Sequence, residues 1–190
     1  DNLSGNAGND SLDGGLGNLA WHVEGYDRDT DNIDIAGFAT ADPAERPADE
    51  KRGTLPNSYS NSDGYSGGLS WVGDKGYLGA AVSGFQTEYG LPGPVEEEGG
   101  DGEPEPFEGP FLDMDQTRID LRGEYLLENS LIEKAKIAVA TNDYTHREIE
   151  GSGEVATTFE NDQWEARFEA VHNLVADFKG AAGIEFDSRD

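Results

Sequence analysis

The alternation of side chains in Arg118–Tyr125 constrains the fold of this chain more than any other feature. Apolar and charged residues strictly take turns there, which is the pattern of a β-strand with one apolar and one charged face. After a break at Leu126–Ser130, the segment Lys134–Thr141 alternates again, so the two segments predict a hairpin. The apolar face of such a pair must be covered by a second sheet or by lipid.

Five further segments alternate in the same way and predict strands of the same sheet. Their connections are alternately long and short, as in outer-membrane barrels, whereas the loops of an immunoglobulin-like sandwich need not sort by side. We expect the two long loops, Asp31–Asn61 and Pro94–Pro110, to lie at one end of the sheet and to be its least ordered parts. The five segments are Leu19–Tyr26, Tyr65–Trp71, Tyr77–Tyr89, Trp164–Ala170 and Lys179–Asp187.

The predicted fold class is therefore all-β: an antiparallel up-and-down meander of about seven strands that forms an open section of a large transmembrane β-barrel. One face of this sheet should be apolar and face lipid, with aromatic residues serving as interfacial girdle residues. The girdle candidates are Trp21, Trp71, Trp164 and Tyr125. The residues expected to share the apolar face are Ile119, Leu121, Ala135, Ile137, Val139, Trp164, Ala166 and Phe168.

The charge of the chain limits its partners. The 190 residues include 40 acidic and 13 basic ones, so the net charge is −27, which argues against nucleic acid as a partner. Cysteine is absent, and no zinc-protease motif or nucleotide-binding glycine loop occurs, so we expect a protein that is not an enzyme and has no cofactor. No apolar run is long enough for a transmembrane helix.

Residues 1–13 form a lead-in that is rich in glycine and asparagine. Gly5–Asp13 resembles one nonapeptide of the RTX calcium-binding β-roll, but the next copy, which begins at Gly14, has Leu19 where the second aspartate should be. Because such units need stacked neighbours, we favour a flexible turn over a β-roll fragment. The alternative function is a secreted RTX-type calcium-binding β-roll protein, with calcium as its ligand only in that case.

Two groups of residues are candidate metal ligands. One lies around His146, near the outer end of its strand, and the other is an acidic run in the second long loop. Carboxylates suit hard cations, and histidine is a common metal ligand. The alternatives are an ordinary rim residue for His146 and a solvated surface loop for the acidic run. The candidates are His146, Glu148, Glu150 and Asp143 in the first group, and Glu96, Glu97 and Glu98 in the second.

A series of motifs over residues 14–190 resembles the β-barrel of TonB-dependent outer-membrane receptors, most closely the subgroup implicated in zinc uptake. The series is specific as a whole because the motifs recur in the same order. In the zinc subgroup the loop after the Tyr-Gly-Leu-Pro-Gly element is rich in histidine, whereas here it is acidic and has none. The motifs lie in Gly14–Gly37, Gly53–Ser58, Leu69–Gly73, Thr87–Gly93, Asp113–Glu124 and Asp143–Gly151.

The resemblance implies TonB-energised uptake of a metal ion or of a metal chelate such as a siderophore complex across the bacterial outer membrane. The implied partners are outer-membrane lipid, a small-molecule or metal substrate, and the TonB system acting through a plug domain. No segment of the sequence resembles that plug domain. We therefore expect this chain to be a middle section, a partial barrel, of such a receptor.

Overall fold

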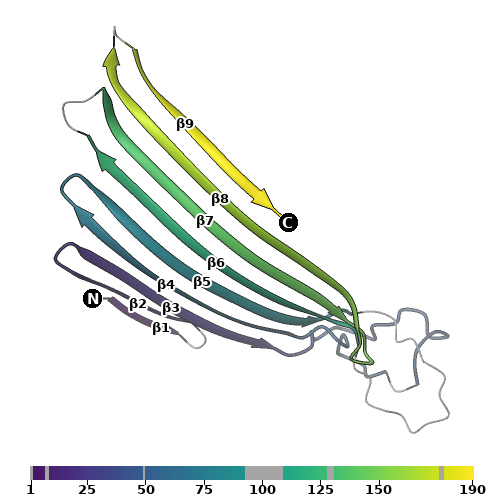
Figure 1. Cartoon of the computed structure of the whole chain (residues 1–190). Coiled ribbons are helices and arrows are strands. Elements are labelled where there is room, and N and C mark those ends of the chain that lie inside the picture. The colour runs from purple at the N-terminus through teal and green to yellow at the C-terminus, as the bar shows by residue number, and fades with distance from the viewer. Residues whose placement is uncertain (1, 7–8, 49, 93–108, 128–130, 176–177) are drawn as a thin grey trace.

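The computed structural model describes residues 2–6, 9–48, 50–92, 109–127, 131–175 and 178–190. Within these residues the chain forms one open sheet of nine strands, in which each strand pairs antiparallel with its neighbours in sequence (Figure 1). The strands are β1 (Asn2–Asn6), β2 (Asn9–Leu16), β3 (Leu19–Thr30), β4 (Ser60–Gly73), β5 (Gly76–Gly90), β6 (Phe111–Leu126), β7 (Ile132–Ile149), β8 (Val155–Val175) and β9 (Phe178–Arg189).

The predicted meander is confirmed, and its strands are longer than the alternating segments alone indicated. The predicted segments all lie within β3 to β9. Several of these strands continue beyond the alternating segment, toward the long loops. The short connection between β4 and β5 contains only Asp74 and Lys75, because Gly73 and Gly76 already face each other in the ladder. Among the described residues, no helix is long and apolar enough to cross a membrane.

The first two strands correct the expected strand count of about seven. The glycine-rich lead-in is part of the sheet, because β1 pairs with β2 and β2 pairs with β3 along its whole length. The boundary drawn after residue 13 therefore falls inside β2. The antiparallel pairing of β1 with β2 also differs from a β-roll, whose successive turns stack in parallel.

Glycines on the sheet provide space for aromatic rings of the neighbouring strand. Each of three rings lies opposite a glycine in the register, and a Cβ built on that glycine would overlap the ring. The aromatic side chain thus covers backbone that would otherwise be exposed, which helps to fix the register. The pairs are Gly14 with Trp21, Gly64 with Tyr26 and Gly84 with Tyr65.

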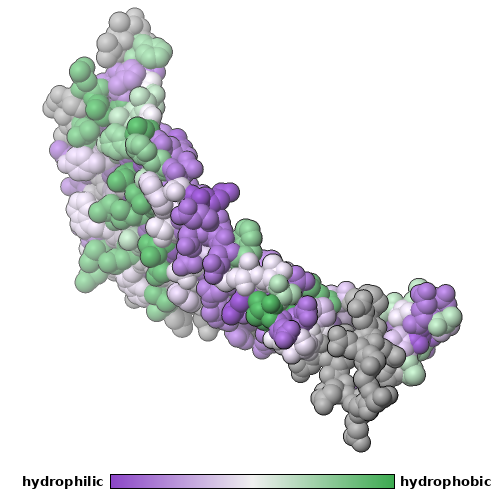
Figure 2. All heavy atoms as spheres, turned by 45° about the vertical axis from the view of Figure 1, so that its right-hand side comes forward, coloured by the Kyte–Doolittle hydropathy of each residue, from purple (hydrophilic) through white to green (hydrophobic). Residues whose placement is uncertain are grey.

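The sheet has no hydrophobic core of its own. Among the described residues, Ala140 is the only buried apolar side chain, and it is 5% exposed. Large apolar residues on the opposite face are about half exposed, as Ile119 (52%) and Phe168 (48%) are. Figure 2 shows that hydrophobic atoms gather over the short-turn half of the visible surface and that hydrophilic atoms lie beside them and toward the loops. A single layer with this surface needs a covering for its apolar face.

The first long loop has local backbone pairing that its composition did not indicate, and its low order relative to the strands stays a prediction. A backbone bridge joins Asp34 to Thr54, and the Leu55 amide donates to the Ile33 carbonyl at 2.8 Å. Arg46 stacks over the Phe38 ring at 3.8 Å and pairs with Glu50, whose side chain is 5% exposed. Local pairing and an ion pair therefore replace the apolar core that the loop lacks. Most of the second long loop, 93–108, lies outside the described residues.

Candidate functional site

Charged side chains and the ion pairs between them are concentrated on one face of β6 to β9, here called the charged wall. Because side chains alternate along each strand, register pairing puts Arg118, Asp120 and Arg122 of β6 on the same face as Glu165 and Arg167 of β8. The chain carries 13 basic residues in all, and this face gathers about half of them. The wall therefore mixes both signs in a chain that is strongly acidic overall.

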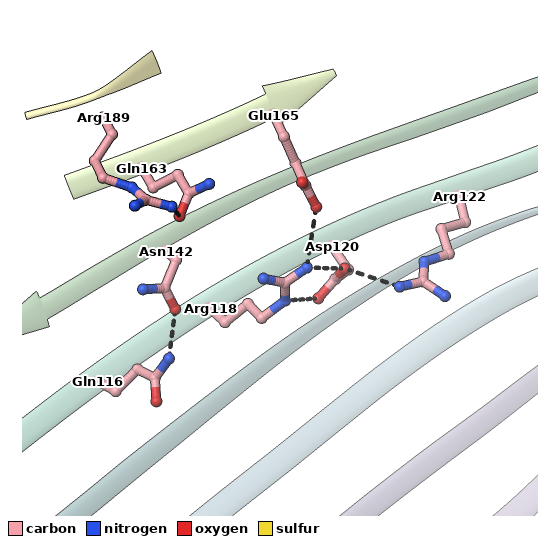
Figure 3. A network of polar contacts seen from close by, with 8 residues as sticks. All are labelled: Gln116, Arg118, Asp120, Arg122, Asn142, Gln163, Glu165 and Arg189. Carbon is pink, nitrogen blue, oxygen red and sulfur yellow. Dashed lines mark hydrogen bonds and ion pairs between the residues drawn. The ribbon is translucent and has the colours of Figure 1, made fainter. Parts of the chain in front are cut away.

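Arg118 is the centre of an ion-pair network on the charged wall (Figure 3). Its Nε donates to Asp120 Oδ2 at 2.8 Å, and its Nη2 donates to Asp120 Oδ1 at 3.1 Å. The same Nη2 reaches Glu165 Oε1 at 3.5 Å, and Arg122 approaches Asp120 from the other side at 3.5 Å. Two guanidinium groups thus share the carboxylate of Asp120, and these contacts hold that carboxylate in position on the wall.

Small residues on β7 make the contact between Arg118 and Glu165 possible. The two residues belong to β6 and β8, and β7 runs between them. The register places Ala140 directly between Asp120 and Glu165, and Ala138 between Arg122 and Arg167. A long side chain at either alanine would separate the charged groups of the outer strands. The alternation of alanines on β7 therefore lets the network span three strands.

Ion pairs between adjacent strands lie on the short-turn side of the network. The ammonium of Lys134 lies 2.9 Å from Glu124, and that of Lys136 lies 2.8 Å from Glu169. Arg167 approaches the same Glu169 carboxylate at 3.3 Å. These groups are partly exposed to solvent, which screens their charges, so each pair contributes little to stability. Their main effect is to balance the charge along the wall.

The charged face changes character on β3 to β5, where small residues dominate. Among the larger side chains on this face is His22, whose Nδ1 lies 2.5 Å from Asp13 Oδ1 and whose Nε2 lies 3.2 Å from Glu24 Oε2. The sequence places Glu24 beside His22, since both point to one face of β3, but Asp13 on β2 could be found only from the register. Both ring nitrogens of His22 are therefore engaged by carboxylates.

The opposite face carries an apolar belt that ends abruptly in an acidic band. On β6 the side chains of this face run from Tyr125 through Leu121 and Ile119 to Asp115 and Asp113. The other strands change from apolar to acidic at the same level, because their registers align. The acidic band is toward the long loops and consists of Asp27, Asp29, Asp63, Glu88, Asp113, Asp115, Asp143, Glu160 and Asp162.

The structure separates the candidate metal ligands of β7. His146 lies on the charged face, where Tyr144 Oη is 3.4 Å from its Nδ1 and the Phe159 ring centroid is 6.4 Å from its own. By the strand alternation Glu148 shares that face, whereas Asp143 points to the acidic band on the other side. Glu150 follows the strand in the turn to β8. Within the described residues, no group of three or more acidic or histidine side chains is placed to hold a metal ion.

The remaining metal candidates, Glu96, Glu97 and Glu98, lie outside the described residues. The assignment of His146 and Glu148 as ligands stays a prediction. Asp143 cannot join them on the same face of the sheet without breaking the alternation of β7.

Asn57 joins the stems of the two long loops, which the sequence did not indicate. Its side-chain amide donates to the Leu91 carbonyl at 2.9 Å and to the Pro110 carbonyl at 2.7 Å. Its backbone has a φ of 54°, in the left-handed region that asparagine tolerates better than most residues. The Leu91 amide also donates to the Pro110 carbonyl at 2.9 Å. The only signal in the sequence was the Pro-Asn pair, which is typical of a turn.

We expect Asn57→Asp to loosen this junction. A carboxylate has no hydrogen to donate and would face two carbonyl oxygens, so both hydrogen bonds are lost, each worth about 0.5–1.5 kcal/mol. Amide hydrogen exchange at Leu91 should therefore accelerate about 10- to 100-fold. The control is Asn32→Ala, which removes the 2.8 Å bond from the Ser58 amide in the same loop but leaves Leu91 and Pro110 untouched. Equal exchange rates at Leu91 in the two variants would contradict this role of Asn57.

Comparison with known proteins gives only a distant structural likeness. No family model matches the chain. A solved structure with a similar arrangement is described as OmpT (in-vitro folded), an outer membrane protein of Vibrio cholerae in its trimer form. The two sequences are 10% identical, the TM-score is 0.47, and the alignment covers 95% of this chain and 45% of that one. This chain thus spans less than half the length of the protein it matches.

Proposed function

We propose that this chain is a section of the wall of an outer-membrane β-barrel, with the apolar belt toward lipid and the charged wall toward a hydrated interior. The observation that carries this proposal is that the apolar belt gives way to the acidic band at the same level on successive strands. A transmembrane barrel has an outward apolar band, polar inward positions, short periplasmic turns and longer outer loops. A soluble sheet would instead bury the half-exposed residues of the belt.

In this arrangement the acidic band lies outside the hydrocarbon. A carboxylate in contact with hydrocarbon is costly, so the level of Asp115 and Asp143 limits how far the sheet enters the bilayer on the loop side. The loops that follow β3, β5 and β7 then face outward, and the two-residue turn at Asp74 and Lys75 faces the periplasm. The junction at Asn57 lies at the outer mouth.

We further propose that the complete protein takes up a metal ion or metal chelate with energy from TonB. The support for this finer function is the ordered series of motifs in residues 14–190, together with a charged wall suited to a water-filled or domain-filled interior. His146, Glu148 and Glu150, with Glu96, Glu97 and Glu98, remain the proposed contacts for the metal. The absence of enzymatic activity stays a prediction.

The test is metal accumulation by bacterial cells that express the complete protein, with and without a functional TonB. We expect uptake of labelled Zn²⁺, Mn²⁺ or a ferric chelate to saturate and to require TonB. His146→Ala should raise the half-saturation concentration for the metal at least several-fold. The control is His172→Ala, because His172 lies at the short-turn end, where its Nδ1 is 2.7 Å from the Asn173 carbonyl.

Two other outcomes would overturn parts of this proposal. Uptake that is linear with concentration and independent of TonB would indicate a passive pore and would refute energised transport. Recovery of the complete protein in the soluble periplasmic fraction would refute the outer-membrane location itself.

A further inference from the structure

We propose that a hollow in the apolar belt, centred on Gly123, holds one acyl chain of a phospholipid from the leaflet on the short-turn side. The inference rests on the proposed membrane location and adds a binding site to it. The hollow has a volume of about 340 Å³ and lies over β5, β6 and β7. Its side-chain walls are Leu78, Ile137, Trp71, Tyr125 and Phe168, with Ala135 between them.

The hollow lies over a position of the belt that has no side chain. Gly123 lies between Leu78 and Ile137 in the register, and a Cβ built on it would be 3.0 Å from Leu78 Cδ1 and 3.3 Å from Ile137 Cγ2. One row toward the loops, the corresponding position is filled by Leu121 between Ala80 and Val139. Other glycines of this face, such as Gly67 and Gly84, lie outside the hollow.

The walls of the hollow specify a hydrocarbon ligand. Trp71 (49%), Tyr125 (49%) and Phe168 (48%) stand half exposed around the glycine and form a rim of rings. The surface inside is almost entirely carbon, so water would find too few hydrogen-bond partners to be held there. A methylene chain can fill the space and gains about 0.8 kcal/mol for each buried CH₂ group.

The position of the hollow selects a phospholipid from the short-turn leaflet. Gly76 faces Tyr125, which is two residues from Gly123, about 7 Å along the strand. Lys75 precedes Gly76 in the turn, and its carbonyl accepts the Leu126 amide at 2.6 Å, which fixes the turn beside this end of the hollow. A lipid whose chain fills the hollow therefore places its headgroup at the level of the turn formed by Asp74 and Lys75.

Retained brominated lipid provides the test, because bromine on an acyl chain quenches tryptophan fluorescence at contact. The complete protein is reconstituted in bilayers of phosphatidylglycerol and phosphatidylcholine with brominated chains and is then exchanged into detergent without bromine. The contributions of Trp71 and Trp164 are obtained by subtracting the spectra of Trp71→Phe and Trp164→Phe. Both residues lie on the apolar face, but only Trp71 borders the hollow.

We expect both tryptophans to be quenched in the bilayer, and Trp71 alone to keep at least half of its quenching after exchange. Gly123→Leu should abolish the retained part, because the leucine fills the hollow. Its control is Gly67→Leu, since Gly67 lies on the same face outside the hollow and its Cβ would meet only the His22 carbonyl at 3.9 Å. Native mass spectrometry of the exchanged protein should show one bound phospholipid in the parent.

Each other outcome is decisive. Equal loss of quenching at Trp71 and Trp164 would overturn the lipid site while leaving the membrane location intact. A lipid-free dimer in the mass spectrum would also overturn it, because a second copy of the chain would then cover the hollow. No quenching of either tryptophan in the bilayer would instead refute the proposed membrane location. The comparison of Trp71 with Trp164 in the parent protein decides the matter even if Gly123→Leu does not fold.

Discussion

Leu121→Arg should lower the free energy of unfolding by about 2–4 kcal/mol, whereas Arg122→Ala, one residue along, should lower it by less than about 1 kcal/mol. Leu121 points to the apolar belt, between Ala80 and Val139, so an arginine there would meet hydrocarbon. Arg122 points to the charged wall, where its side chain is 66% exposed and touches Asp120 only at 3.5 Å. The second change removes a weak contact that water can replace.

The measurement for this pair is urea unfolding of the complete protein in lipid vesicles. Because the two residues are adjacent on β6, differences in strand position or local stability cannot explain a different result. Equal losses, or a larger loss for Arg122→Ala, would mean that the two faces of the sheet are assigned in reverse.

The strands from β3 to β9 were predictable because their sequence reports their environment. A strand with lipid on one side and water on the other must alternate, and Arg118–Tyr125 does so at every position. The pairing order followed from short turns between neighbours. β1 and β2 were missed for the opposite reason: their glycines and asparagines carry no alternation, and their place in the sheet follows only from pairing with β3.

The site was predictable in composition but not in its contacts. The sequence shows that cations and carboxylates share the charged face, and the pairs of Lys134 with Glu124 and Lys136 with Glu169 connect adjacent strands. The contact of Arg118 with Glu165 crosses a whole strand and depends on the alanines of β7. The metal prediction placed Asp143 beside His146 because they are close in sequence, although strand alternation puts residues 143 and 146 on opposite faces.

Glycines explain the features that lay beyond sequence patterning. The sequence shows where a glycine occurs, but not whether its missing side chain admits an aromatic ring, a lipid chain or another backbone. Gly84 admits the ring of Tyr65, Gly123 leaves the hollow in the belt, and Gly76 admits the backbone of β6. Each assignment needs the register of the neighbouring strand.

Gly76→Ala should be among the most destabilising small substitutions in the chain, with a loss of about 1–3 kcal/mol or more in the free energy of unfolding. A Cβ at Gly76 would overlap the carbonyl oxygen of Glu124 and approach the Tyr125 Cα at 2.9 Å. These atoms are backbone of the neighbouring strand, so they can move only if the ladder between β5 and β6 opens at its short-turn end. The bond from the Leu126 amide to the Lys75 carbonyl should be lost as well.

The matched control is Gly67→Ala in the middle of β4, where the added methyl group would meet only the His22 carbonyl, at 3.9 Å. Both substitutions restrict the unfolded chain alike, so that contribution cancels in the comparison, whereas the φ of 159° at Gly76 adds to the loss at that position. Urea unfolding of both variants in lipid vesicles, with amide exchange at Leu126 as the local readout, measures the difference. We expect Gly67→Ala to be neutral or slightly stabilising and to leave the Leu126 amide protected. If Gly76→Ala were equally neutral, the close approach of β5 and β6 at this turn would be incorrect, and with it the position of Lys75 beside the hollow.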